Sequence, residues 1–142
     1  MTTIIPKILL LDDEFRDTAR ILYSQIIKKG DELDRWDLNN LVHLLQLLWS
    51  EPIQVVRFQA AIISKDPSSE CTVVSLPKDQ NGIGNFRISP VKVACCLFRW
   101  PKLTEIRRIA SVPWCKVKLN TGNNKICLNP YHYLAKLAHC KI

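Results

Sequence analysis

The sequence lacks an apolar run long enough to cross a lipid bilayer. Its longest apolar stretches, residues 4–11 and 41–49, are short, and Lys7, His43 and Gln46 interrupt them. A helix that spans the roughly 30 Å hydrocarbon core needs about 20 consecutive apolar residues. The sequence therefore predicts no transmembrane segment.

A cleavable secretory signal is also missing from the first residues. Asp12, Asp13 and Glu14 follow the first apolar run, where such a signal needs small residues at a cleavage site. We therefore expect an intracellular protein. In a reducing compartment the six cysteines do not favour a disulfide framework, so metal binding is the better explanation for some of them.

Acidic residues are scarce in the C-terminal part. The formal net charge is +7, and residues 101–142 contain eight Lys or Arg but one acid, whereas residues 1–50 contain six basic and eight acidic residues. A local excess of positive charge suits a polyanionic partner such as nucleic acid. A solvated basic face is the alternative explanation.

Internal repeats, low-complexity segments and long linkers are absent too. A chain of 142 residues with 47% hydrophobic content is sufficient for one domain with an ordinary core. We expect a single domain over residues 1–142, with an N-terminal extension (1–13), a helical part (14–66) and a part with hairpins and metal ligands (67–142). This order, helices first and short strands afterwards, predicts the α+β class.

The helical part shows two amphipathic patterns. In residues 14–29 apolar side chains recur every three or four positions, which predicts a helix with one buried face and an aspartate at position 12 or 13 as its cap. In residues 38–49 a leucine stripe predicts a second helix, with Asp37 as the N-cap and Pro52 beyond its end. The stripe is expected to be core.

After Asp66 the pattern changes to short β-prone segments between prolines and glycines. Residues 71–75 predict a strand, and Asn81-Gly82 predicts a hairpin near residues 78–90. Residues 91–98 are apolar almost throughout, which favours a further, central strand. A short helix over 103–110 and a last helix over 131–141, with Pro130 near its first position, complete the expected elements.

Two metal-ligand candidates belong to one local segment. Cys127 and His132 are five positions apart, and the turn expected at Asn129-Pro130 can bring their side chains to one ion. Tetrahedral zinc needs two more ligands. Cys115 lies across a polar loop, and Cys71 at the start of a strand is the fourth candidate.

Such a Cys3His site is closed and therefore structural, because no position remains for a substrate. The alternative is that these are buried cysteines beside a surface histidine. His139 and Cys140 can compete with His132 as ligands. The remaining candidates have structural explanations: Cys95 and Cys96 as core thiols, His43 as a non-ligand histidine, and Trp36, Trp49, Trp100 and Trp114 as packing residues.

Three segments carry a family resemblance. Arg99-Trp100-Pro101-Lys102-Leu103, Trp114-Cys115 and Cys127-Leu128-Asn129-Pro130-Tyr131-His132-Tyr133 resemble, in order and spacing, the second half of the N-terminal Mad homology 1 (MH1) domain of SMAD transcription factors. The resemblance begins near Phe15 and is strongest after Val91. It implies a fold related to His-Me finger proteins and places the family's zinc ligands on Cys71, Cys115, Cys127 and His132.

The resemblance also implies a DNA-reading hairpin. In the family an arginine, a glutamine two residues later and a lysine five after that read a GTCT-type element in the major groove. Counted back from Trp100, these positions fall on Gln80, Gly82 and Arg87, so only the cationic contact is retained. The expected DNA contacts are Arg87, Gln80, Lys78 and Asn81 in the hairpin, with Asn85 as a further candidate, and Lys28 and Lys29 in the basic second helix. Fewer basic residues there than in relatives imply weaker, less salt-sensitive binding.

The function implied is that of a zinc-stabilised, sequence-specific DNA-binding domain of a SMAD-type transcription regulator in TGF-β-type signalling, without enzymatic activity. Other SMAD proteins and transcription cofactors are the implied partners, and the implied location is the nucleus and the cytoplasm. The alternative is a degenerate MH1 module that serves protein interaction. The Cys-x-Asn-Pro-x-His element also occurs in His-Me finger nucleases, but these need a histidine base just before the first cysteine, where this chain has Pro113 and Trp114.

Overall fold

The structure, a computed structural model, describes residues 13–27, 35–76, 89–119 and 124–136. The α-helices in these ranges are α2 (Asp13–Tyr23), α3 (Arg35–Leu48), α4 (Pro52–Ser64) and α5 (Pro90–Phe98). The strands are β1 (Val73–Ser75), β2 (Ile109–Ser111), β3 (Lys125–Cys127) and β4 (Tyr133–Ala135), and the 3-10 turns are η1 (Ile106–Arg108) and η2 (Pro130–His132). The α+β class is confirmed. Of the described helices, none has the length and apolar character to cross a membrane.

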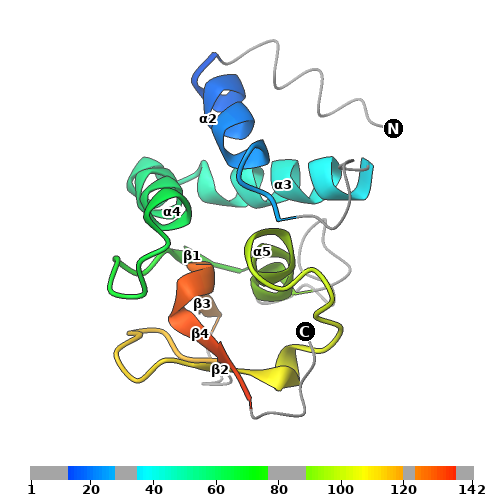
Figure 1. Cartoon of the computed structure of the whole chain (residues 1–142). Helices are drawn as coiled ribbons and strands as arrows, with labels where there is room; N and C mark the ends of the chain where they lie inside the picture. The colour runs from blue at the N-terminus through cyan, green and yellow to red at the C-terminus, as the bar shows by residue number, and fades with distance from the viewer. Residues whose placement is uncertain (1–12, 28–34, 77–88, 120–123, 137–142) are drawn as a thin grey trace.

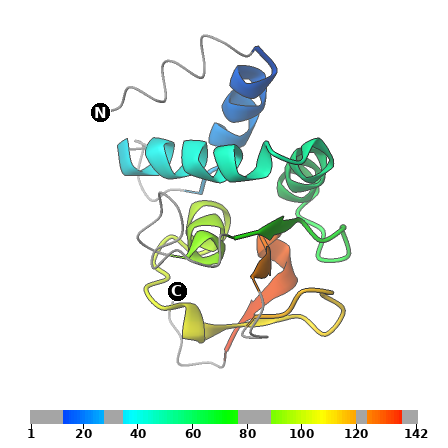
Figure 2. The ribbon, with the colours of Figure 1, turned by 180° about the vertical axis from the view of Figure 1, so that it is seen from behind.

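The helices and the strands occupy different ends of the molecule. Helices α2, α3 and α4 gather at one end, the strands lie at the other, and α5 is between them (Figures 1 and 2). The strands form two separate antiparallel pairs, β1 with β3 and β2 with β4. Helix α5 packs on α3 and on η2, so one buried helix connects the helical end to the strand end.

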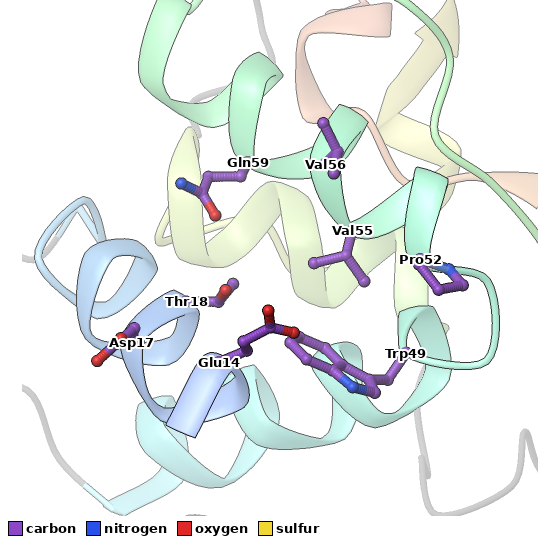
Figure 3. A pocket seen from close by; sticks show the side chains of 8 residues that line it. All are labelled: Glu14, Asp17, Thr18, Trp49, Pro52, Val55, Val56 and Gln59. Atoms are coloured by element: carbon purple, nitrogen blue, oxygen red, sulfur yellow. The ribbon is translucent and has the colours of Figure 1, made fainter. Parts of the chain in front are cut away.

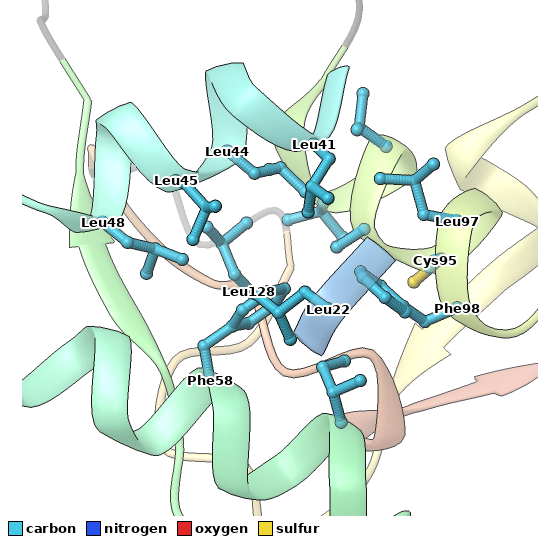
Figure 4. Close-up of a cluster of buried hydrophobic side chains, with 14 of the residues drawn as sticks. Leu22, Leu41, Leu44, Leu45, Leu48, Phe58, Cys95, Leu97, Phe98 and Leu128 are labelled. Carbon is cyan, nitrogen blue, oxygen red and sulfur yellow. The ribbon is translucent and has the colours of Figure 1, made fainter. Parts of the chain in front are cut away.

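The leucine stripe of α3 forms the centre of the hydrophobic core. Leu41, Leu44, Leu45 and Leu48 are fully buried, as are Leu22 of α2, Phe58 of α4 and Leu128 (Figure 4). The rings of Phe58 and Phe98 meet edge to face with centroids 5.8 Å apart. The prediction that this stripe is core is confirmed.

The two predicted N-terminal helices exist with different ends. Helix α2 begins at Asp13 and ends at Tyr23, six residues before the predicted end. Helix α3 begins at Arg35, so Asp37 lies in its first turn and is not its cap. The chain then turns and starts α4, which the sequence did not predict, with Pro52 in its first turn. Proline lacks only an N–H that the first turn would leave unpaired, so it starts a helix as readily as it follows one.

The prediction of a central strand over residues 91–98 is wrong, because this segment is helix α5. The Ser89 side chain accepts a hydrogen bond from the Val91 N–H at 3.1 Å, and Pro90 occupies the first turn. Almost every side chain of α5 is buried, so the sequence has no polar face whose period would reveal a helix. Cys95 and Cys96 are core thiols, as predicted, and burial raises the pKa of both.

The two C-terminal helix predictions are also wrong within the described residues. Residues 103–110 form the 3-10 turn η1 and the start of β2. Pro130 starts a single 3-10 turn, and the chain then extends as β4, which pairs with β2 in the register Ser111 to Tyr133. Pairing with β2 gives these backbone groups partners that a longer helix would have supplied internally. Residues 137–141 of that prediction lie outside the described residues.

Candidate metal centre

The two strand pairs bring four possible metal ligands together at the strand end of the molecule. β1 and β3 pair in the register Val73 to Cys127, and the Leu128 N–H donates to the Thr72 carbonyl at 2.7 Å. This pairing brings Cys71, just before β1, next to Cys127 at the end of β3. The strand predicted over 71–75 is present, but it is shorter and covers only β1, Val73–Ser75.

The second strand pair supplies the other two residues. β4 pairs with β2, and the bond from the Val112 N–H to the His132 carbonyl, at 2.9 Å, continues this ladder. Cys115 follows in a turn in which its N–H donates to the Val112 carbonyl at 3.1 Å. Cys115 and His132 therefore meet the first pair from the opposite side.

The four side chains form one cluster of possible metal ligands. The ligand atoms of Cys71, Cys115, Cys127 and His132 all lie within 4.8 Å of one another, and all four residues are buried. The Sγ atoms of Cys71 and Cys115 are 3.8 Å apart, and the His132 Nδ1 atom is 3.5 Å from Cys71 Sγ and 3.6 Å from Cys127 Sγ. Metal bonds of typical length around tetrahedral zinc separate two sulfurs by about 3.8 Å and a sulfur from a nitrogen by about 3.6 Å. The cluster therefore has the dimensions of a Cys3His zinc site.

Protonation within the cluster also suits a cation. A hydrogen bond from the Cys127 thiol lowers the pKa of Cys115 to about 4, while this bond and burial raise the pKa of Cys127. Burial raises the pKa of Cys71. Burial alone would lower the pKa of His132, but hydrogen bonds with Cys115 and Ser69 raise it. A cation bound among these sulfurs would favour the deprotonated form that binds metal.

The cluster is enclosed and separate from the main core. Val112 is buried among the cysteines, and Val73 and Val117 pack against them. Cys127 and His132 are 0% and 1% exposed. A metal held here would have four protein ligands and no side open to a substrate, which is typical of a structural site.

Several candidate residues lie outside the described residues. These are Lys28, Lys29, Lys78, Gln80, Asn81, Asn85 and Arg87, expected at the DNA surface, and the alternative ligands His139 and Cys140. The hairpin predicted near residues 78–90 falls largely in the same gap, between β1 and α5. His43 is partly buried in α3, where burial lowers its pKa, and it takes no part in the cluster.

Arg99 has contacts that the sequence did not predict, although the residue is part of the Arg-Trp-Pro segment quoted above. Its guanidinium Nη1 donates to the carbonyls of Pro130 and Tyr133 at 3.1 and 2.7 Å, on either side of His132. The guanidinium also lies over the rings of Trp100 and Tyr131, with its Cζ 4.2 and 5.1 Å from the two centroids. Arg99 thereby ties the end of α5 to the segment that carries His132.

The tryptophan predictions are half right. Trp49 and Trp100 pack against the core, as predicted. Trp36 and Trp114, by contrast, are 46% and 55% exposed. The Trp114 indole N–H donates to the Pro67 carbonyl at 2.8 Å, so this ring has a defined position although it is largely exposed.

A cavity of about 360 Å³ opens at the helical end, between α2 and α4 (Figure 3). Glu14, Asp17 and Thr18 of α2 line it, together with Trp49, Pro52, Val55, Val56 and Gln59. Its lining is mainly apolar and includes the two acidic residues Glu14 and Asp17. None of its lining residues belongs to the Cys/His cluster, so it is not part of the metal centre.

Comparisons with known proteins agree with this geometry. The MH1 domain family model matches residues 38–136, a range that includes all four cluster residues. The chain is similar to the Smad protein daf-8 of Caenorhabditis elegans, with 29% identity over 126 residues, which is 87% of this chain. The match covers 22% of daf-8, so the chain corresponds to about a fifth of that protein.

Proposed function

Because the chain belongs to the MH1 domain family, we propose that it is a zinc-stabilised DNA-binding domain of a SMAD-type transcription regulator. The observation that carries this proposal is the buried convergence of Cys71, Cys115, Cys127 and His132, whose ligand atoms lie within 4.8 Å of one another. Three thiolates and one imidazole are a typical ligand set for structural zinc.

The proposed zinc would connect the two strand pairs. Cys71 and Cys127 belong to one strand pair and Cys115 and His132 flank the other, so an ion held by all four residues would join the two pairs. The strands are only three residues long, and two-stranded sheets of this size have little stability of their own. Zinc supplies a cross-link that replaces many weaker contacts.

The zinc proposal predicts one tightly held zinc per chain. Elemental analysis of the purified protein should find it, and Cys127→Ser and His132→Ala should lose the metal and unfold at a lower temperature, because metal binding contributes directly to folding. Cys95→Ser, which changes a buried thiol outside the cluster, is the control that should keep its zinc. Zinc-free wild-type protein of unchanged thermal stability would contradict the proposal.

The distribution of charge supports the DNA-binding part of the proposal. Among the described residues from Ser89 onward there are nine Lys or Arg and one acid, Glu105. Residues 13–27 and 35–76 contain five basic and seven acidic residues. The basic excess therefore belongs to α5 and the strand end, and a phosphate backbone is the polyanion that such a surface attracts.

We propose that the segment between β1 and α5 contacts DNA through Arg87, Gln80, Lys78 and Asn81, with Lys28 and Lys29 as further phosphate contacts. The test is binding to GTCT-type, GC-rich and scrambled duplexes of equal length at several salt concentrations. We expect tighter binding to the GTCT-type duplex and an affinity that falls with salt for all three. Equal affinity for the three duplexes would contradict sequence-specific binding and would indicate only non-specific electrostatic attraction to DNA.

The second candidate is an MH1 module that serves protein interaction and binds DNA weakly or without specificity. It is favoured by Gln80 and Gly82, which stand where the family has its base-reading arginine and glutamine. The absence of measurable binding to all three duplexes, in a protein that is folded and holds zinc, would favour this candidate. We do not propose a nuclease, since Pro113 and Trp114 occupy the place of the required histidine base.

The wider role is proposed from the family. We propose that the protein takes part in TGF-β-type signalling, associates with other SMAD proteins and transcription cofactors, and moves between cytoplasm and nucleus. The MH1 family match and the similarity to daf-8 support this.

A further inference from the structure

One short turn contacts every segment that carries a residue of the cluster. Residues 66–70 connect the end of α4 to Cys71. This turn accepts hydrogen bonds from His132, from Asn129 near Cys127, and from Trp114 next to Cys115.

The bond to His132 determines which ring nitrogen faces the cysteines. The His132 Nε2 atom lies 2.7 Å from the Ser69 carbonyl oxygen, which can only accept, so Nε2 carries the proton. The Nδ1 atom is then the one free to bind a metal, and it is the nitrogen that lies 3.5 and 3.6 Å from two Sγ atoms. A carbonyl behind a histidine ligand sets its tautomer and its ring orientation in this way.

The bonds to Asn129 position the segment between Cys127 and His132. Asn129 is fully buried, and its Nδ2 atom donates to Ser69 Oγ and to the Glu70 carbonyl, each at 2.9 Å. Its Oδ1 atom accepts from the Tyr131 N–H at 2.9 Å and caps η2. One amide therefore anchors the 3-10 turn of His132 to residues 69 and 70.

The third bond reaches the segment of Cys115. The Trp114 indole N–H donates to the Pro67 carbonyl at 2.8 Å, although the side chain is 55% exposed. The bond gives this largely exposed ring a fixed polar contact. It connects the residue beside Cys115 to the same turn.

Asp66 organises the turn itself. Its Oδ1 atom accepts from the Ser68 N–H and the Ser68 hydroxyl, each at 2.9 Å. Its carbonyl accepts from the Ser69 N–H at 3.0 Å and from the Ser69 hydroxyl at 2.7 Å. Lys65, which has a positive φ of 55°, ends α4 and sends the chain into this arrangement. The carbonyls of Pro67, Ser69 and Glu70 are thus presented to the cluster.

We infer that the turn of residues 66–70 is the outer support of the zinc site, and that Asp66 and Trp114 are positioning residues for metal binding although neither can touch the ion. The inference rests on the proposed zinc site. The turn holds His132 with its Nδ1 atom toward the metal and places the segments of Cys115 and Cys127 at the correct separation. Loss of outer support of this kind typically weakens metal affinity about 10- to 100-fold.

The test uses variants that change the support and leave every ligand intact. Asp66→Ala removes the acceptor of both Ser68 bonds, and Trp114→Phe removes only the indole N–H. Asp66→Asn keeps a side-chain oxygen that can accept the same bonds and should restore most of the affinity. The matched controls are Asp13→Ala, which removes an exposed carboxylate paired with Arg16 on α2, and Trp36→Phe, which changes another exposed tryptophan, far from the turn in sequence.

Two readouts separate positioning from general stability. Competition for Zn²⁺ with a chromophoric chelator should show affinity about 10-fold weaker for Asp66→Ala and Trp114→Phe, and unchanged affinity for both controls. The visible absorption of the Co²⁺-loaded protein reports ligand geometry, and it should change in these two variants and match the wild type in Asp66→Asn. Circular dichroism at saturating Zn²⁺ checks that each variant is folded.

The outcomes distinguish the two proposals. A wild-type protein that binds neither Zn²⁺ nor Co²⁺ overturns the zinc site and this inference together. A wild-type protein that binds both ions, with variants of equal affinity and identical Co²⁺ spectra, overturns the inference alone. Should Asp66→Ala not fold, Trp114→Phe still decides, because it removes one hydrogen bond from a largely exposed side chain.

Discussion

At the scale of single residues, Arg99 has a structural role inside the fold in addition to its positive charge. Its guanidinium donates to two backbone carbonyls on either side of His132 and lies over two aromatic rings. Burial lowers the pKa of Arg99, but arginine starts from so high a pKa that the group stays charged. A lysine ammonium could also donate to two carbonyls, but it lacks the planar face with which the guanidinium lies over the two rings.

We predict that Arg99→Met destabilises the protein by about 2–4 kcal/mol, because the carbonyls of Pro130 and Tyr133 lose a charged donor inside the fold. Arg99→Lys should recover only part of this loss. Urea unfolding at a fixed zinc concentration measures the change. Arg107→Met is the control: Arg107 is exposed and pairs with Glu105, and its loss should cost at most about 0.5 kcal/mol. Similar losses for the two methionine variants would show that Arg99 contributes only through its charge.

At the scale of elements, α5 is the helix that connects the helical end of the molecule to the strand end. It contacts α3 on one side and η2 on the other, and its Cys95 and Phe98 belong to the same buried cluster as the leucines of α3 (Figure 4). A helix of nine residues is too short to be stable alone in water. Its stability therefore comes from this burial and from its N-cap.

We predict that Ser89→Ala costs about 1 kcal/mol of unfolding free energy, because the Ser89 side chain is the acceptor for the Val91 N–H at the start of α5. Ser89→Asp should restore the cap. Ser50→Ala is the matched control, since the exposed Ser50 hydroxyl only donates to the Leu47 carbonyl at 3.3 Å. Thermal or urea unfolding gives the comparison, and an equal effect at the two serines would argue against a capping role.

At the scale of the whole molecule, the excess of positive charge and the Cys/His cluster lie at the same end. The strand end carries the Cys/His cluster and most of the basic excess, whereas the helical end carries most of the described acidic residues and the cavity between α2 and α4. In the proposed complex with DNA, this separation would orient the domain in the field of the polyanion before any specific contact forms. Specific reading of bases then depends on the few residues that reach the groove.

We predict that Arg87→Ala weakens binding to a GTCT-type duplex by roughly 1–3 kcal/mol and relaxes the preference at one base position, as expected for an arginine that contacts a guanine edge. If Arg87 contacts only phosphate, binding should weaken equally on every duplex and the salt slope should fall by about one. Fluorescence anisotropy at several salt concentrations separates these results.

A gain of function provides the control for that experiment. Gln80→Arg together with Gly82→Gln restores the residues that the family has at these positions. The double variant should bind a GTCT-type duplex more tightly while its affinity for a scrambled duplex changes less. Equal gains on both duplexes would mean that the assumed register of the hairpin is wrong.

The sequence by itself determined the features that depend on local chemistry. The leucine stripe of α3 predicted a core helix, because the spacing of the leucines matches one face of a helix. The spacing of Cys127, Asn129-Pro130 and His132 predicted a turn that brings two possible ligands to one ion. The structure has that turn as η2. Cys71 and Cys115 were found by the residue types that zinc requires and by family resemblance, and the structure brings them to the same cluster.

Only the tertiary structure decided between alternatives that look alike in sequence. Periodicity does not distinguish helix from strand in segment 91–98, because almost all of its side chains are buried. Residues 133–135 are strand because β2 offers partners for their backbone. Arg99 and the turn of residues 66–70 act on segments at least 30 positions away. Their partners depend on how the described helices and strand pairs pack together, and that packing is a property of the whole chain rather than of any local pattern.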